Sequence, residues 1–311
     1  MKSFKPHGTK QIIREQWCRK IIESTGANLT YLGLPAKEAL DVFNWLPHLD
    51  KVIAFQCSDH RPDKVITWED AAYLESKLLT IERKSDISSY SLYKGYIETV
   101  VLRGRDEGGK PFDATKPVQI FNLDFCNQLT SPLKTFDENS NPVKYYKLET
   151  VAKLLEYQRD LPIADIKKNF TMFITVHANI NELELMVHRD EISGGEYADY
   201  YNSITNLQGI ERNIRLVKLS MFHFLKTCFC SRFFVPHFLP PVFYQGTGSH
   251  KLLTFTVKGV YEKTSIGSAA FKQDMRALLN SKFVFADNNG LSLHTHSGIL
   301  ENDISINPLT L

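Results

Sequence analysis

Segments typical of buried strands alternate with segments of helical periodicity over residues 10–180, and this alternation restricts the fold more than any other feature. Short apolar runs bounded by turn-forming residues occur at residues 28–35, 50–57, 118–123 and 169–176. Amphipathic helical patterns lie between them. Because parallel strands need crossover connections, this order predicts an α/β fold: a mostly parallel sheet with helices on both faces.

The C-terminal part of the chain has a different pattern. After a long apolar helix at residues 210–229, residues 235–244 and 251–260 predict an antiparallel pair of strands. A helix at residues 268–279 and a hairpin at residues 283–296, around the turn residues Asn288-Asn289-Gly290, are expected to follow. We therefore predict a main domain over residues 1–265 and a C-terminal helix and hairpin extension over residues 266–311.

Two further segments carry local expectations. Residues 95–101 (GYIETVV) predict a strand, since they are rich in β-branched residues. Residues 10–24 predict an amphipathic helix with Trp17 on its apolar face and Lys10, Arg14, Arg19 and Lys20 mostly on other faces. These cations are either a solvated surface or an edge that faces phosphate groups.

Composition places the chain among ordinary globular proteins. Of its 311 residues 43% are apolar and 23% are charged, and the net charge of +2 neither requires nor excludes nucleic acid. No apolar run reaches the roughly 18 residues that a membrane helix needs, and the N-terminal segment has no apolar signal region. The five scattered cysteines favour reduced thiols, and Cys228 and Cys230 lack a second pair for zinc. We expect a cytoplasmic protein with no membrane partner and no metal site.

The segment at residues 117–132 (KPVQIFNLDFCNQLTSP, counted from Lys116) is the centre of the functional hypothesis. A short apolar run over residues 118–123, which includes Asn122, ends at Asp124, and a polar loop follows. In an open α/β sheet, ligands bind just past the carboxyl ends of the strands. The strand is therefore predicted to deliver Asn122 and Asp124 to a site.

Two earlier strand ends are candidates for the other side of this site. The first ends at Gly33, and Pro35 opens a helix, an arrangement that can place backbone donors near a ligand. It can equally be an ordinary tight turn. The second ends at Gln56, whose amide can bond a hydroxyl group, with Asp59 a few positions further on. Asp59 is either an acid for ribose hydroxyls or the cap of the next element.

The order of these elements resembles the Rossmann-like fold of S-adenosylmethionine-dependent methyltransferases, over about residues 25–260. The motif Asn122-Leu123-Asp124-Phe125-Cys126, with Ser131-Pro132 downstream, is similar to the strand-end motif of enzymes that methylate amino groups of nucleic acids. The resemblance implies S-adenosylmethionine as cofactor, held by Gly33, Pro35, Gln56 and Asp59. It implies Asp124, Asn122 and Phe125 as residues next to the transferred methyl group. The sequence departs from the family in having one glycine at the first turn, Gln56 instead of an acid, and no proline after Asp124.

The chemistry follows from the side chains themselves. Methyl transfer is an in-line displacement, so the protein mainly aligns donor and acceptor. Asp124, or the backbone carbonyls beside it, could accept an N–H of the attacking amine, unless Asp124 only caps the loop. Phe125 could stack on an extruded base, or it is a core aromatic. A Cys126–His177 nucleophilic pair and a metal site at His294 and His296 are weaker alternatives.

Two functions from different classes remain open at this point. The first is a methyltransferase that acts on an amino group, with a nucleic acid or a protein as partner. The second is a catalytically inactive Rossmann-like binding or partner subunit, which the single glycine and Gln56 favour. A metal nuclease is a weaker third, since no Asp…Glu-x-Lys arrangement is found along a pair of strands.

Overall fold

A computed structural model of the chain describes residues 8–58, 67–125, 129, 131–136, 141–178, 189–246, 250–264, 271–294, 300–301 and 308–309. The described strands are β1 (Leu29–Gly33), β2 (Leu49–Gln56), β3 (Ser89–Lys94), β4 (Ile120–Asp124), β5 (Leu133–Phe136), β6 (Pro142–Tyr145), β7 (Phe170–His177), β8 (Phe234–Phe238), β9 (Val242–Gln245), β10 (Lys251–Tyr261), β11 (Phe283–Asp287), β12 (Gly290–His294) and β13 (Leu300–Glu301). All except β5 and β6 belong to one sheet.

The described helices are α1 (Gly8–Ile12), α2 (Arg19–Thr25), α3 (Leu40–Trp45), α4 (Glu69–Arg83), α5 (Ile97–Arg103), α6 (Lys147–Asp160), α8 (Arg189–Ser193), α9 (Ala198–Thr205), α10 (Gly209–Cys230) and α11 (Met275–Asn280). A π-helical segment, η1 (Ile13–Cys18), joins α1 to α2, so that residues 8–25 form one continuous N-terminal helix. Short 3₁₀ turns are η2 (Leu46–His48), η3 (Asp165–Lys168) and η4 (Gly195–Tyr197).

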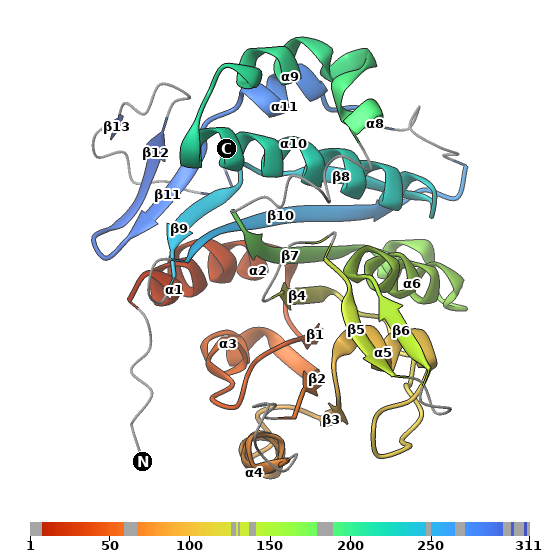
Figure 1. Ribbon diagram of the computed structural model, residues 1–311. Coiled ribbons are helices and arrows are strands. Elements are labelled where there is room, and N and C mark those ends of the chain that lie inside the picture. Colours follow the sequence, from red (N-terminus) through yellow and green to blue (C-terminus); the bar gives the residue numbers. More distant parts are fainter. Residues whose placement is uncertain are drawn as a thin grey trace.

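The sheet has the order β13-β12-β11-β9-β10-β7-β4-β1-β2-β3, with β8 also paired to β10 (Figure 1). Strands β3, β2, β1, β4 and β7 run parallel, and β10 runs antiparallel to β7. The predicted α/β class, with a mostly parallel sheet and an antiparallel terminal part, is confirmed. The segment at residues 118–123 is the fourth strand along the chain, as predicted.

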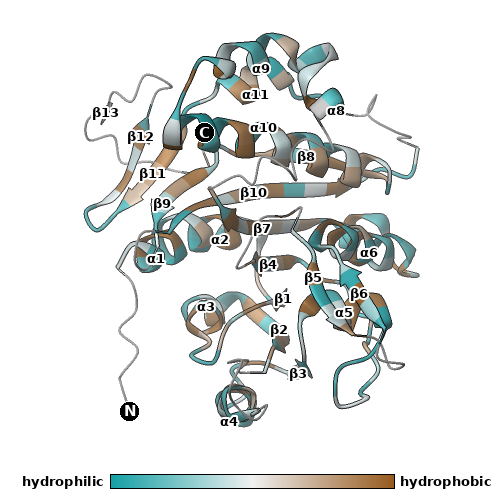
Figure 2. Ribbon diagram, viewed as in Figure 1, coloured by the Kyte–Doolittle hydropathy of each residue, from teal (hydrophilic) through white to brown (hydrophobic). Residues whose placement is uncertain are grey.

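Helices cover both faces of the sheet because each has one apolar face. The N-terminal helix, α3 and α4 form the first helical layer, where Trp17, Trp45 and Leu74 belong to one hydrophobic cluster. Helices α5, α6 and α10 form the second layer, where Leu154 and Phe222 belong to the other cluster. Apolar residues concentrate on the strands and inner helix faces, and hydrophilic residues on the outer faces (Figure 2). Burial of these two faces supplies the main stabilising free energy.

The antiparallel end of the sheet contains a broken strand. Residues 234–238 and 242–245 both pair with β10, one pair after the other along its length. Pro240 and Pro241 lie between them and have no N–H to donate, so the ladder is interrupted there. The extension then continues the same sheet: β11 pairs parallel to β9, and β12 pairs antiparallel to β11. The proposed division at residue 265 stays a prediction.

One predicted strand is wrong. Residues 95–101 were expected to be extended, but β3 ends at Lys94 and residues 97–103 form α5. Gly95 has a φ of +129°, which ends the strand. Ile97, Val100 and Val101 are then spaced at i, i+3 and i+4, so they share one helical face and are buried. Helical spacing and tertiary burial outweigh the β-branched composition.

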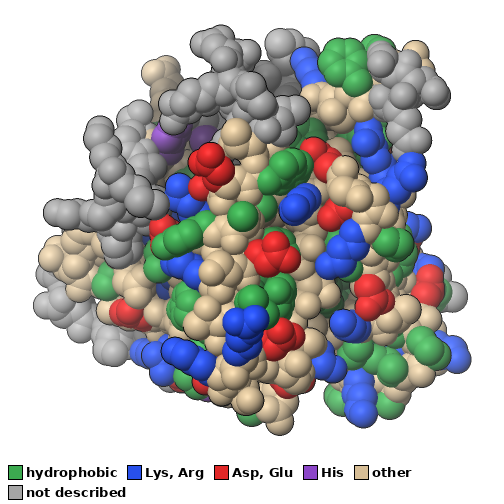
Figure 3. All heavy atoms as spheres, turned by 90° about the horizontal axis from the view of Figure 1, so that it is seen from below, with side chains coloured by type: hydrophobic (Ala, Val, Ile, Leu, Met, Phe, Trp, Pro, Cys, Tyr) green, Lys and Arg blue, Asp and Glu red, His purple; other side chains and the backbone are tan. Residues whose placement is uncertain are grey.

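The surface shows no broad area of one charge on the face seen from below. Basic and acidic side chains are interspersed there with hydrophobic ones (Figure 3). This agrees with the near balance of 37 basic and 35 acidic residues in the whole sequence. Electrostatic attraction for a partner must therefore come from a local group of side chains.

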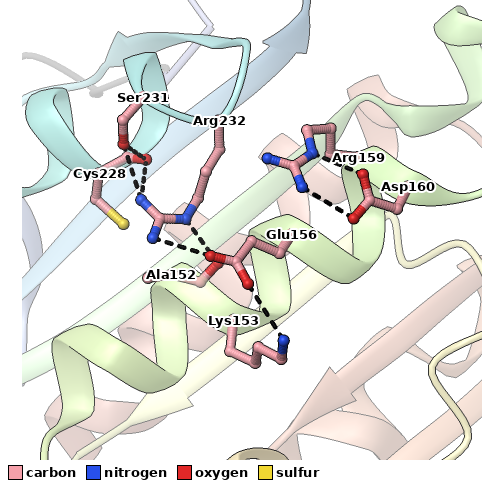
Figure 4. A network of polar contacts seen from close by, with 8 residues as sticks. All are labelled: Ala152, Lys153, Glu156, Arg159, Asp160, Cys228, Ser231 and Arg232. Carbon is pink, nitrogen blue, oxygen red and sulfur yellow. Dashed lines mark hydrogen bonds and ion pairs between the residues drawn. The ribbon is translucent and has the colours of Figure 1, made fainter.

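The end of α10 is held to α6 by a network of polar contacts. Arg232 donates to the backbone carbonyls of Cys228 (3.3 Å) and Ala152 (2.9 Å), and its guanidinium lies 3.1 Å from a carboxylate oxygen of Glu156 (Figure 4). Carbonyls in the last turn of a helix lack intrahelical donors, and Arg232 donates a hydrogen bond to one of them, that of Cys228. The network fixes the second helical layer against the sheet.

Among the described residues, no helix combines the length and the apolar character needed to cross a membrane.

Candidate functional site

The carboxyl edge of the parallel strands brings most of the predicted site residues together. Gly33 of β1 lies in register with Asn122 of β4 on one side and with Ala54 of β2 on the other. The chain order changes direction at this place, because β2 and β3 extend from β1 on one side, and β4 and β7 on the other. Such a topological switch point is where ligands bind in open α/β sheets.

Asn122 lies in a buried polar network. It is 8% exposed, and its amide donates to a carboxylate oxygen of Asp41 (2.8 Å) and contacts the Tyr31 hydroxyl (3.4 Å). The other carboxylate oxygen of Asp41 accepts from Arg14. Burial, with the charge of Asp41, raises the pKa of Tyr31 well above its usual value, so Tyr31 stays neutral. The amide of Asn122 thus has partners within the fold.

Asp124 ends β4 and is paired with a cation of the N-terminal helix. The ammonium of Lys10 lies 2.5 Å from the Asp124 carboxylate, and the two side chains are 32% and 30% exposed. Burial by itself would lower the pKa of Lys10, but the charge and hydrogen bond of Asp124 outweigh it and hold that pKa above its usual value. Asp124 keeps access to solvent.

The N-terminal helix reaches both carboxylates because Lys10 and Arg14, four positions apart, share one helical face. Lys10 pairs with Asp124, Arg14 with Asp41, and the indole N–H of Trp17 donates to Thr256 at 2.9 Å. A π-turn has more residues than an α-turn, so it changes which side chains face the sheet, and such turns are frequent at functional sites. The predicted basic residues Lys10 and Arg14 are therefore neither a solvated face nor a free phosphate edge.

Phe125 is 3% exposed and belongs to the hydrophobic cluster of the second helical layer. The ammonium of Lys147 lies 5.9 Å from its ring centre and donates to the carbonyl of Ser131 at 2.7 Å. Lys147 also forms a buried ion pair with Glu98 (3.8 Å). Burial raises the pKa of Glu98 above its usual value, against the opposing charge of Lys147. In this position Phe125 is a core aromatic, and stacking on a base would require it to become exposed.

Gly33 is required by close packing. A Cβ at this position would lie 2.5 Å from both the Asn122 carbonyl and the Tyr31 hydroxyl. The left-handed backbone of the following turn falls instead on Ala36 (φ 52°) and Ala39 (φ 49°). Pro35 stands within this turn, and the helix begins only at Leu40. Glycines would adopt these left-handed conformations without strain, whereas the two alanines adopt them at a cost in conformational free energy.

The end of β2 contains an unsatisfied polar atom that points to a ligand. Gln56 donates its side-chain amide to the Cys57 carbonyl (3.3 Å). Ser58 is 4% exposed, and its hydroxyl has no hydrogen-bond partner among the residues that the structure describes. Buried hydroxyls are nearly always paired, so an unpaired one at a strand end fits a ligand that carries hydroxyl or amine groups. Asp59 lies outside the described residues.

Two histidines lie next to this edge. His177 ends β7, and its ring centre is 5.2 Å from that of His250. Burial, followed by the charge of His250, lowers the pKa of His177, while Asp124 opposes the shift. Cys126 and His296 lie outside the described residues, so the predicted Cys126–His177 pair and His294–His296 site stay untested. Within the described part of the chain, no group of three or more potential metal ligands occurs.

Three residues of this site were not predicted as such: Arg14, Asp41 and Ser58. The Arg14–Asp41 contact joins residues 27 positions apart, and the Asp41–Asn122 contact joins residues 81 positions apart. For Arg14, the sequence showed only that it is one of several basic residues on the first helix. That pattern did not indicate that the cations point toward the sheet. The Ser58 hydroxyl gave none, since its isolation is a property of the packing.

Comparisons with known proteins find distant similarity to solved structures. No family model matches the chain, and no curated protein matches it in sequence. Solved structures with a similar arrangement include EvdMO1 (11% identity, TM-score 0.37, 82% of this chain and 41% of that one). A precorrin-6y C5,15-methyltransferase from Geobacter metallireducens has 6% identity and a TM-score of 0.32 over 81% of this chain and 91% of that one. A SAM-dependent methyltransferase from Agrobacterium tumefaciens has 10% identity and a TM-score of 0.34 over 81% and 62%.

The chain spans less than half of EvdMO1 and 62% of the Agrobacterium enzyme. Because every one of these TM-scores is below 0.5, the comparisons assign no activity and no ligand. The strand order and the strand directions are properties of the chain itself. On that basis the fold is Rossmann-like, and several of its structural neighbours are methyltransferases at low sequence identity.

Proposed function

We propose that the chain is an S-adenosylmethionine-dependent methyltransferase that acts on an amino group of a nucleic acid. The observation that carries this proposal is the position of Asp124. It is a carboxylate with 30% of its side chain exposed, at the end of the central strand, beside the topological switch point. A group at this place faces the ligand site of an open α/β sheet.

The residues present fit the cofactor at one side of the edge. The unpaired Ser58 hydroxyl and the Gln56 amide are suited to hydroxyl groups of a ribose, and the turn after Gly33 supplies backbone donors. When bound, S-adenosylmethionine would supply a methyl group activated by a sulfonium centre. Gly33, Pro35, Gln56, Ser58 and Asp59 are the residues we assign to holding it.

Asp124 would act on the acceptor. An amine becomes more nucleophilic when its N–H donates to a carboxylate, since the carboxylate stabilises the positive charge that develops on nitrogen. Lys10 holds this hydrogen-bonding position in the structure. The incoming amine therefore takes the place of the Lys10 ammonium at this carboxylate.

A second candidate is a catalytically inactive binding or partner subunit. A specific observation favours it: the Asn122 amide is occupied by Asp41 and Tyr31, and it is buried. Gln56 is a neutral group where an acid would bind ribose more strongly. In this candidate the polar network at the strand ends has only a structural role.

Calorimetry with S-adenosylmethionine and S-adenosylhomocysteine separates the two candidates. We expect the wild-type chain to bind both, and Ser58→Ala to bind more weakly, because the hydroxyl loses its ligand partner. Ser76→Ala, an exposed serine on α4, is the matched control and should bind as the wild type does. No binding of either ligand at high excess would rule out the methyltransferase and leave the inactive subunit.

If transfer to an acceptor is detected, Asp124→Ala tests the assignment of the carboxylate. We expect a rate reduction of roughly 10²-fold or more, the usual contribution of a positioned proton-accepting group. An unchanged rate would show that another group accepts the amine.

A further inference from the structure

The hairpin formed by β5 and β6 stands outside the main sheet, in the connection between Asp124 and α6 (Figure 1). Two-stranded hairpins are marginally stable in water by themselves. This one is fastened to α5 by Arg103, which donates to the Tyr145 hydroxyl (2.8 Å) and to the Phe136 carbonyl (2.8 Å). The guanidinium also lies 5.3 Å from the centre of the Tyr145 ring.

The outer face of this hairpin has an unusual composition. Leu133, Thr135, Val143 and Tyr145 are half-buried on the inner face, and Lys134, Phe136, Pro142 and Lys144 are exposed on the outer face. Lys134 lies directly opposite Lys144, and Phe136 lies opposite Pro142. Like charges in directly opposed positions destabilise a pair of strands. No ion pair of either lysine occurs among the described residues, and Phe136 is 65% exposed.

A face that holds two cations, neither in an ion pair with another described residue, and an exposed aromatic ring is suited to a polyanion with flat, stackable groups. Single-stranded nucleic acid has both: phosphates that pair with lysines and bases that stack on aromatic rings. An acidic peptide would satisfy the charges and leave Phe136 without a stacking partner. The chemistry of the outer face therefore favours nucleic acid over protein.

The position of the hairpin connects this face to the candidate site. The Lys147 ammonium, just after β6, contacts both the Ser131 carbonyl (2.7 Å) before β5 and the ring of Phe125 (5.9 Å). Phe125 directly follows Asp124. The base of the hairpin thus contacts the residue that directly follows the proposed acceptor carboxylate at the end of β4.

We propose that the outer face of the β5–β6 hairpin binds a single-stranded segment of nucleic acid, with Lys134 and Lys144 on phosphates and Phe136 stacked on a base. This inference rests on the proposed function for its biological sense, but its test needs no cofactor and no transfer.

The experiment is fluorescence anisotropy with a labelled oligodeoxythymidine of about 20 nucleotides, longer than one binding site of roughly 4–16 nucleotides. We expect the wild-type chain to bind it. For the variant K134E/K144E, log K should fall less steeply with log salt, the magnitude of the slope being smaller by about 1.4, because two phosphate contacts contribute ~0.7 each. At physiological salt this variant should bind roughly tenfold more weakly. Phe136→Ala should weaken binding roughly fivefold or more.

Matched controls separate a local effect from a general change of charge or hydrophobicity. K84E/K167E changes the same number of exposed charges far from the hairpin, and Ile166→Ala truncates another exposed apolar side chain (74% exposed); both should bind as the wild type does. Lys134→Glu alone controls for folding. It creates an opposite-charge pair with Lys144, so it should keep or raise the melting temperature while it weakens binding.

Three results would overturn the proposal. They are failure of the wild-type chain to bind the oligonucleotide, equal binding by wild type and K134E/K144E, and competition by polyglutamate as effective as by unlabelled oligonucleotide. The last would indicate an acidic-peptide surface. Calorimetry of K134E/K144E with S-adenosylmethionine distinguishes the two proposals, since its cofactor binding should equal that of the wild type whichever way the anisotropy falls.

Discussion

Lys218 on α10 is a fully buried lysine that connects the second helical layer to the C-terminal extension. It is 0% exposed, and its ammonium donates to the carbonyls of Leu279 (2.9 Å) and Ser281 (2.8 Å) and to the Ser281 hydroxyl (3.2 Å). These acceptors lie at the end of α11 and just after it. The connection makes the stability of the protein depend on the charge of one side chain.

Burial, with a smaller contribution from the charge of Arg215, lowers the pKa of Lys218 from 10.5 to about 7. In the unfolded chain the ammonium keeps its proton up to about pH 10.5, whereas the folded protein releases it near pH 7. The unfolded state therefore binds more protons between these values, and the folded state gains stability as pH rises through this window. The slope is about 1.4 kcal/mol per pH unit, and protonation of Lys218 costs the folded state roughly 5 kcal/mol below pH 7.

We predict that Lys218→Met removes this pH dependence. Methionine has a similar length and no charge, so the cost of burying an ammonium disappears. The carbonyls of Leu279 and Ser281 lose a donor, which costs about 1–3 kcal/mol for each group left unsatisfied. The two effects nearly cancel at pH 7. At pH 9.5 the wild type has regained about 3.5 of the roughly 5 kcal/mol, so the variant should then be less stable than the wild type by about 3 kcal/mol.

Urea unfolding followed by tryptophan fluorescence at pH 7.5, 8.5 and 9.5 measures the effect. The free energy of unfolding of the wild type, relative to that of Lys218→Met, should rise by about 1.4 kcal/mol for each pH unit. Lys167→Met, at an exposed lysine, is the control and should run parallel to the wild type. Parallel curves for wild type and Lys218→Met would refute the reasoning, because they would mean that Lys218 titrates alike in both states.

Three further predictions concern the candidate site. Gly33→Ala should lower the free energy of unfolding by about 1–3 kcal/mol in urea titrations, since its Cβ would lie 2.5 Å from the Asn122 carbonyl; an unchanged midpoint would contradict the tight contact. Ala36→Gly should raise it by about 1 kcal/mol, since glycine adopts a φ of 52° without strain, and a loss would show that the turn is not left-handed there. Lys10→Met should lower it by up to about 1 kcal/mol. Since Asp124, against burial, holds the pKa of Lys10 above its usual value, that difference should persist below pH 10.5 and vanish only at higher pH.

Much of the fold was predictable because its signals are local. The apolar run before Asp124 and the strong strand at residues 170–177 each end on polar residues, and strand–helix alternation leads to parallel pairing. The predicted α/β sheet with an antiparallel end is what the structure shows. The wrong element, residues 95–101, failed because a short β-branched segment fits either a strand or a helix face until its burial is known.

The location of the candidate site in the fold was predictable from the sequence, but the contacts within it were not. Strand ends gave Gly33, Gln56, Asn122 and Asp124, and the parallel sheet brings them to one edge. Their partners were not predictable, because Lys10 is 114 positions from Asp124 and Asp41 is 81 positions from Asn122. Nothing in the local pattern of a helix reveals which carboxylate its cations will meet.

The sequence by itself determined the class of fold, the central strand and the carboxylate at its end. Each of these depends on residue periodicity and turn residues within about ten positions, and these patterns are visible in the sequence alone. Only the tertiary structure decided that Asn122 is buried against Asp41, that Lys10 pairs with Asp124, and that the Ser58 hydroxyl has no partner among the described residues. The reason is physical: hydrogen bonding and burial are properties of surroundings, and the surroundings of a strand end are assembled from distant parts of the chain.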